Sequence, residues 1–252
     1  MVDRRSIKEI IEEWIRKHPS RKSPEAGRRN IYFELQAIII LVSVFSLYHY
    51  PPVLGLPHAD VLILDMTHGQ NPSRAYFTDL LDRAHLSSLV YESVSVDMIR
   101  LIPTGNYRYI ILWGHSGLND MATTEPYSPL HHILEQLTGE VGNYLVQGKE
   151  YFSLQPGLVM SMKGTLSGSP VLLMGCNTLT QPGLASAFLR KGSSLVIGWT
   201  GLVSVAVTDM VVMTLFQKIL QDHEPLSQAL AETNRLLGSM GMTNILTSFK
   251  LQ

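Results

Sequence analysis

The chain has 252 residues, of which 20 are basic, 21 are acidic and 45% are hydrophobic. This near-neutral balance gives no global field to recruit nucleic acid or an acidic substrate, so the composition argues against duplex binding. One cysteine cannot form an intrachain disulfide, and cysteine content therefore does not indicate the redox compartment.

Residues 1–31 are predicted to form a basic amphipathic helix and a linker. Ser6 and Glu9 have the spacing of a capping box. The apolar residues that follow recur at helical spacing on one face, at Ile7, Ile10, Ile11, Trp14 and Ile15. This face is expected to have a partner, either the membrane surface, another protein or a second copy of the chain. Residues 18–27 are typical of a solvated linker.

Residues 32–52 are predicted to form a single transmembrane helix. The chain has no charged side chain from Leu35 to Leu56, and roughly 17 to 25 predominantly apolar residues suffice to cross the bilayer. A buried core helix is the alternative, because the densest apolar part, Ala37 to Leu47, is short. Basic residues precede the span and the next one is Arg74. The positive-inside rule therefore predicts a cytoplasmic N-terminus and an extracytoplasmic domain.

Residues 58–240 are predicted to form one α/β domain, followed by a tail at 241–252. Strands are expected at residues 61–65, 88–96, 109–114, 171–175 and 194–200, and helices at 75–85, 183–191, 205–220 and 225–237. Strands separated by helices predict a largely parallel sheet with helices on both faces. In the insertion from 118 to 170, residues 119–129 are interpreted as a loop, and residues 141–146 and 158–162 as a hairpin beside the cleft or an extension of the sheet.

Two of the expected strands end on chemically active residues. Tyr109–Gly114 is followed by His115, and Val171–Gly175 is followed by Cys176. Catalytic groups of parallel sheets lie at the carboxyl ends of strands. A thiol of pKa about 8.5 needs a neighbouring imidazole to become a thiolate at neutral pH. The pattern therefore predicts a nucleophile and a base. An inert core cysteine is the alternative, which the polar segment after Cys176 disfavours.

These elements, in this order, resemble the caspase-like peptidases of clan CD, most closely the CHAT and gingipain-like branch. The resemblance covers about residues 60–238. It rests on strand-His-x-Gly at Ile110–Gly117, strand-Gly-Cys at Val171–Cys176, and the segments 183–192, 195–199, 203–204, 208–220 and 225–230. It implies a caspase-like fold and a cysteine endopeptidase acting on a protein or peptide, with Cys176 as nucleophile and His115 as general base and acid. Together with the predicted span at residues 32–52, this predicts a membrane-anchored endopeptidase.

The resemblance also implies further site residues. Backbone N–H groups of Ser116, Gly117 and Cys176 would hold the oxyanion. Relatives usually have glycine where this chain has Ser116, and several carry an acidic residue soon after the cysteine that is missing here. Families of this kind include inactive members, so a caspase-fold binding or signalling module is the alternative function. Arginine- or lysine-selective relatives use a carboxylate for specificity, which Asp65 or Asp209 would supply; Asp65 equally suits a loop-capping role.

Other candidate residues are weaker. Gly114–Leu118 matches the nucleophile elbow G-x-S-x-G in part, with Ser116 as nucleophile, but its last position is leucine and the following segment is interpreted as a loop. A serine hydrolase is therefore the less favoured alternative. His68 competes with His115 for the role of base and is expected near the cleft.

No cofactor or metal is predicted. His131 and His132 are adjacent, which does not favour convergence on one ion, and they have no cysteine or carboxylate at ligand spacing. They are interpreted as solvated. The chain also has no G-x-G-x-x-G after a strand and no Walker lysine.

Overall fold

A computed structural model describes residues 55–240 and 246–250, together with residues 13, 16–17, 35–36 and 38–40. The chain divides into two units, residues 1–54 and 55–252. Within the described residues, no helix has the length and apolar character required to cross a membrane. The predicted basic helix and linker at 1–31, and most of the predicted span at 32–52, lie outside the described residues.

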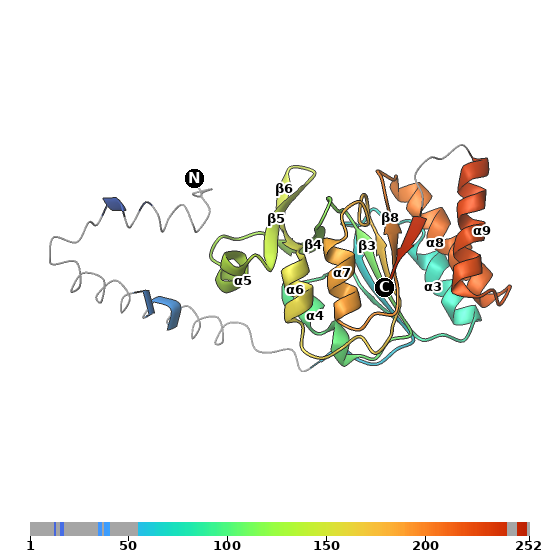
Figure 1. The fold of residues 1–252 in the computed structure, drawn as a ribbon, viewed down its shortest axis with the longest axis horizontal. Coiled ribbons are helices and arrows are strands. Elements are labelled where there is room, and N and C mark those ends of the chain that lie inside the picture. The colour runs from blue at the N-terminus through green and yellow to red at the C-terminus, as the bar shows by residue number, and fades with distance from the viewer. Residues whose placement is uncertain are drawn as a thin grey trace. The chain divides into compact units, whose positions relative to one another are not determined.

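A six-stranded sheet forms the centre of the second unit (Figure 1). The strands lie in the order β2 (Ser88–Tyr91), β1 (Val61–Met66), β3 (Tyr109–Gly114), β7 (Val171–Met174), β8 (Val196–Trp199) and β9 (Leu246–Phe249). The first five are parallel, and β9 is antiparallel to β8. The predicted α/β class with a mostly parallel sheet is confirmed.

Helices cover both faces of this sheet because its central strands are apolar on both sides (Figure 1). On one face, Leu62, Ile110 and Leu173 join a core formed with α4 (Val96–Arg100), α6 (Pro156–Ser161) and α7 (Gly183–Arg190). On the other face, Ile63 and Ile111 join a core formed with α3 (Arg74–Arg83), α8 (Val205–Leu220) and α9 (Leu226–Ser239).

The insertion between β3 and β7 contains a second, antiparallel sheet in the order β4 (Met121–Pro126), β6 (Lys149–Leu154), β5 (Val141–Val146). A short helix, α5 (Ile133–Thr138), lies between β4 and β5. Two predictions are wrong here. Residues 121–126 form a strand and not a loop, and the partner of residues 141–146 is β6, whereas residues 156–161 form α6. Pro156 at the first position of α6 favours a helix start.

Two other boundaries differ from the sequence analysis. The strand expected over residues 88–96 ends at Tyr91, because the Ser95 side chain caps α4 by accepting a hydrogen bond from the Met98 N–H. A short 3₁₀ turn, η1 (Ile102–Thr104), follows α4. Part of the expected tail, residues 246–249, forms the edge strand β9 beside β8.

Candidate active site

The structure places His115 and Cys176 at equivalent positions beyond two adjacent parallel strands. Trp113 of β3 pairs with Met174 of β7, and His115 and Cys176 each follow two residues later. Both residues are therefore delivered to the carboxyl edge of the sheet, where the sequence analysis expects them.

His115 and Cys176 line one cavity at this edge, with a volume of about 210 Å³. None of its lining residues carries a carboxylate, an ammonium or a guanidinium group. They come from the ends of β1, β3 and β7 and from the start of α8, and are Thr67, Trp113, Gly114, His115, Met174, Gly175, Cys176, Val203, Ser204, Val205 and Thr208. The cavity is therefore a mainly apolar pocket that brings a thiol and an imidazole together.

The thiol of Cys176 contacts the backbone of Val203. Its Sγ lies 3.3 Å from the Val203 carbonyl oxygen, to which it donates, and 3.4 Å from the Val203 nitrogen. Nε2 of His115 is buried and has no hydrogen-bond partner among the described residues. Burial lowers the pKa of His115 because it penalises the charged imidazolium. Burial thus favours the neutral imidazole, and no described residue donates to its Nε2.

Ser116 joins the loop that carries His115 to the loop that carries Cys176. Its Oγ donates a hydrogen bond of 2.6 Å to the carbonyl oxygen of Cys176, and its side chain is buried. The close approach requires a glycine at position 175. A Cβ there would stand 2.5 Å from the Gly114 oxygen and closer still to Ser116 Oγ. Ser116 does not line the cavity, and its proton is directed at a carbonyl rather than at a base.

The three expected oxyanion donors differ in their availability. The Gly117 N–H donates to both the carbonyl and the Oδ1 of Asp120, at 3.1 and 3.2 Å. The N–H groups of Ser116 and Cys176 have no hydrogen-bond partner within the described segments. These two N–H groups, one on the loop after β3 and one on the loop after β7, are therefore the available donors.

His68 lies beside His115 but does not line the cavity. The two ring centroids are 6.1 Å apart, and the His68 ring packs on Tyr151 at 4.1 Å. Burial lowers the pKa of His68, and the neighbouring His115 lowers it further. His68 is thus positioned to support the His115 ring, whereas His115 borders the thiol's cavity.

Two tyrosines near the site were not found by the sequence analysis. Tyr144 and Tyr151 are paired directly across β5 and β6. Tyr151 contacts His68, while the pKa of Tyr144 is raised by burial and by the nearby Asp120 and Cys176. The small sheet therefore places Tyr151 against His68 and Tyr144 near Cys176. The only sequence signal for this placement is the alternation of side chains along β5 and β6, and it could be used only if residues 149–154 were recognised as a strand.

Neither candidate specificity carboxylate borders the cavity. Asp65 is buried at the end of β1, where it accepts hydrogen bonds from the N–H and hydroxyl of Thr67 and forms a 2.9 Å ion pair with Arg74. Arg74 also pairs with Glu92 at 2.9 Å. The Asp65 carboxylate is thus satisfied within the fold.

Asp209 is buried in α8, 2% exposed, and neither carboxylate oxygen has a well-formed hydrogen bond among the described residues. Burial raises the pKa of Asp209. The polar groups of Ser73 and Trp113 lower it, but they offset the effect of burial only in part. Its neighbour Thr208, and not Asp209 itself, lines the cavity.

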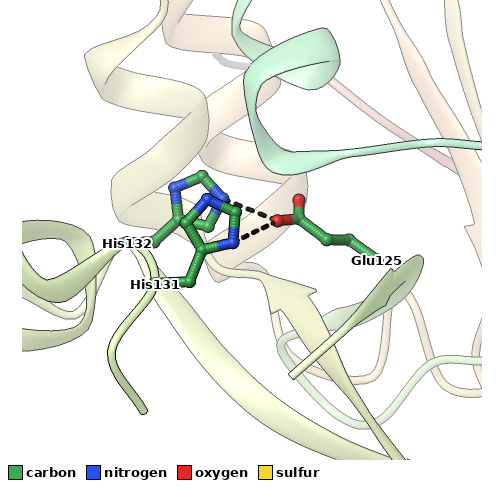
Figure 2. Close-up of side chains that lie close together, drawn as sticks. All are labelled: Glu125, His131 and His132. Atoms are coloured by element: carbon green, nitrogen blue, oxygen red, sulfur yellow. Dashed lines mark hydrogen bonds and ion pairs between the residues drawn. The ribbon is translucent and has the colours of Figure 1, made fainter. Parts of the chain in front are cut away.

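His131 and His132 are not solvated, contrary to the sequence analysis. Both rings contact Oε1 of Glu125 at 2.9 Å, and the His132 side chain is only 6% exposed (Figure 2). Glu125 was missed as their partner because residues 119–129 were interpreted as a loop, whereas Glu125 lies on β4. In the described part of the chain this cluster is a set of side chains suited to a metal ion.

No protein-family model matches the chain, and no curated protein is significantly similar to it in sequence.

Proposed function

We propose that this protein is a membrane-anchored, caspase-like cysteine endopeptidase of the clan CD type, with Cys176 as nucleophile and His115 as base. Residues 32–52 would be its membrane anchor, supported by the uncharged stretch from Leu35 to Leu56. The observation that carries the catalytic proposal is the shared cavity. Two register-matched parallel strands deliver to it a thiol and an imidazole whose buried Nε2 has no hydrogen-bond partner among the described residues.

The arrangement supports acyl transfer in two steps. His115 takes the proton of the Cys176 thiol, and the thiolate attacks the carbonyl carbon of the scissile peptide. The N–H groups of Ser116 and Cys176 stabilise the oxyanion. Return of the proton from His115 to the leaving nitrogen releases the amine and leaves a thioester. Water, deprotonated by His115, then attacks the thioester and releases the acid and the thiol.

One observation favours the alternative, a caspase-fold binding or signalling module without turnover. The thiol donates to the Val203 carbonyl and not to His115. Catalysis requires the thiol to exchange this hydrogen bond for one to the imidazole. Hydrogen bonds of catalytic pairs are often long before substrate binds, and this exchange would separate an active enzyme from an inactive one.

Thiol alkylation and peptide cleavage test the two functions together. We expect iodoacetamide to label Cys176 rapidly near pH 7, and we expect His115→Ala to slow labelling and abolish cleavage. Cys176→Ala should also abolish cleavage, and the double variant should be no worse, because nucleophile and base act as a unit. The exposed His85 provides the control His85→Ala, which should retain both activities.

Three outcomes would contradict the proposal. Full cleavage by Cys176→Ala would exclude the cysteine mechanism. If Ser116→Ala were inactive while Cys176→Ala remained active, the site would belong to a serine hydrolase. Slow alkylation that His115→Ala does not change, without turnover, would identify the inactive module.

A further inference from the structure

A second cluster of titratable side chains lies outside the cavity of Cys176, at the end of β4 and in the turn before α5. Figure 2 shows the imidazole rings of His131 and His132 side by side and directed at the carboxylate of Glu125. Nδ1 of His131 and Nε2 of His132 are each 2.9 Å from Oε1 of Glu125, and the three atoms all lie within 4.8 Å of one another. We propose that Glu125, His131 and His132 form a binding site for a divalent transition-metal ion, with Zn²⁺ as the preferred ion.

The backbone before α5 is what allows two adjacent histidines to act together. His132 has φ 51 and ψ 42, in the left-handed region, which residues other than glycine adopt uncommonly. This conformation lays the two rings on one another, with centroids 4.0 Å apart and planes inclined by 20°. Both rings also contact the edge or face of Phe152 in β6. The histidines are therefore held on one side of the turn by the packed small sheet.

The donor set fits zinc. Imidazole nitrogen and carboxylate oxygen bind Zn²⁺ at about 2.0–2.2 Å, so two ligand atoms on one tetrahedral ion stand roughly 3.3 Å apart. The two nitrogen-to-oxygen distances of 2.9 Å need to widen by only a few tenths of an ångström, together with a rotation of the rings. Three protein ligands leave the fourth position for water, the arrangement of an open zinc site.

The electrostatics of the cluster also favour a cation. Nδ1 of His131 and Nε2 of His132 both face the carboxylate of Glu125. Asp97 and Glu135 add negative potential at His131, and Arg100 compensates Glu135 through a 2.9 Å ion pair.

A bound ion would connect three parts of the fold. The other carboxylate oxygen of Glu125, Oε2, accepts a 2.8 Å hydrogen bond from the N–H of Val96, the first residue of α4. Such a partner orients a metal-binding carboxylate. The ion would thus join β4, the turn before α5 and the start of α4, and so fix the small sheet that carries Tyr144 and Tyr151.

Cobalt substitution of the purified full-length chain, stripped with a chelator, tests the site independently of any peptidase activity. We expect one equivalent of Co²⁺ to bind and to give the visible d–d bands of a four- or five-coordinate ion, without a thiolate charge-transfer band. Zn²⁺ should displace it. Loss of a residue that only orients a metal ligand lowers metal affinity by about 10- to 100-fold. Loss of a ligand itself should cost more, so His132→Ala and Glu125→Gln should each weaken binding by about 100-fold or more.

Two control variants and a check of folding make the result decisive. His223→Ala removes an exposed imidazole elsewhere and should bind Co²⁺ as the wild type does, and so should Cys176→Ala. Glu125→Gln keeps an oxygen acceptor for the Val96 N–H, so it tests the site even if His132→Ala unfolds. Far-UV circular dichroism distinguishes a folded variant that has lost the site from an unfolded one. Wild-type affinity in folded Glu125→Gln, a charge-transfer band that Cys176→Ala removes, or a wild-type chain that binds no Co²⁺ would each overturn the proposal.

Discussion

The hydroxyl of Ser116 donates a 2.6 Å hydrogen bond to the carbonyl oxygen of Cys176. This bond joins the loop that follows β3 to the loop that follows β7, and Ser116 is buried. Ser116 stands where relatives usually have glycine directly after the histidine. Its hydrogen bond gives this serine a structural role, because it fixes the separation of the imidazole and the thiol.

Ser116→Ala should therefore lower kcat/KM by up to roughly tenfold, because a hydrogen bond of this kind contributes about 0.5–1.5 kcal/mol. The effect should fall on kcat and on the rate of thiol alkylation, with KM nearly unchanged. Ser193→Ala is the matched control, since Ser193 Oγ also donates to buried carbonyls but lies away from the cavity. A similar loss of activity in both variants would show that Ser116 acts only through stability.

Gly175→Ala should disrupt the same junction. The added methyl group would overlap Ser116 Oγ and the Gly114 carbonyl, and crowding of this kind in a packed interior costs about 1–3 kcal/mol. We expect a lower midpoint in urea unfolding and a large loss of cleavage. Gly238→Ala in α9, where a Cβ meets nothing within 4 Å, should be neutral or stabilising. Full activity of Gly175→Ala would mean that the spacing of the two loops is not critical.

The pH dependence of kcat/KM should report the buried His115. Its folded-state pKa is lowered by burial, so the imidazole stays in its basic form below the ordinary value of about 6.5. The acid limb of the pH profile is therefore expected below pH 6.5. His68→Ala should admit water beside His115 and move that limb toward higher pH. An acid limb above pH 6.5 in the wild type would contradict the buried neutral base.

The sequence predicted the placement of His115 and Cys176 because the signals for their strands are local. Apolar runs ending at Gly114 and Gly175 identify two buried strands, and parallel pairing then brings His115 and Cys176 to one edge. The partners of the dyad depend on tertiary contacts. Tyr144 and Tyr151 lie near the site only because β5 pairs with β6. The first residues of β6 are polar and exposed, so they carry no strand signal.

The histidine cluster was misinterpreted for a similar reason. Glu125 lies on a strand with a register shift beside Pro126, and His132 adopts a left-handed backbone. Neither feature is encoded by a periodic pattern. The sequence rule that adjacent histidines diverge holds for regular helices and strands, and it fails at this turn.

Membrane topology can be tested with single cysteines, because Cys176→Ala leaves the chain without any. In that background, Ser239→Cys, exposed in α9, should react with an impermeant maleimide on intact cells. Ser20→Cys should react only after permeabilisation, since the basic residues before Leu35 are expected to stay in the cytoplasm. The reverse pattern would invert the topology, and labelling of both sites on intact cells would exclude a single span.

Substrate selectivity should follow the uncharged lining of the cavity. Asp65 is held by Arg74 and Thr67, and Asp209 has a pKa raised by burial, so neither offers an exposed carboxylate to a basic side chain. A cationic side chain entering this cavity would lose its hydration without a partner. We therefore expect cleavage after leucine or methionine to exceed cleavage after arginine, lysine or aspartate in a peptide library, by about tenfold or more, the range typical of pocket discrimination.

Val205→Asp should raise cleavage after arginine, because it introduces a carboxylate into the lining, whereas Asp209→Asn should leave the preference unchanged. Strong cleavage after arginine by the wild type that Asp209→Asn removes would show instead that Asp209 reaches the substrate.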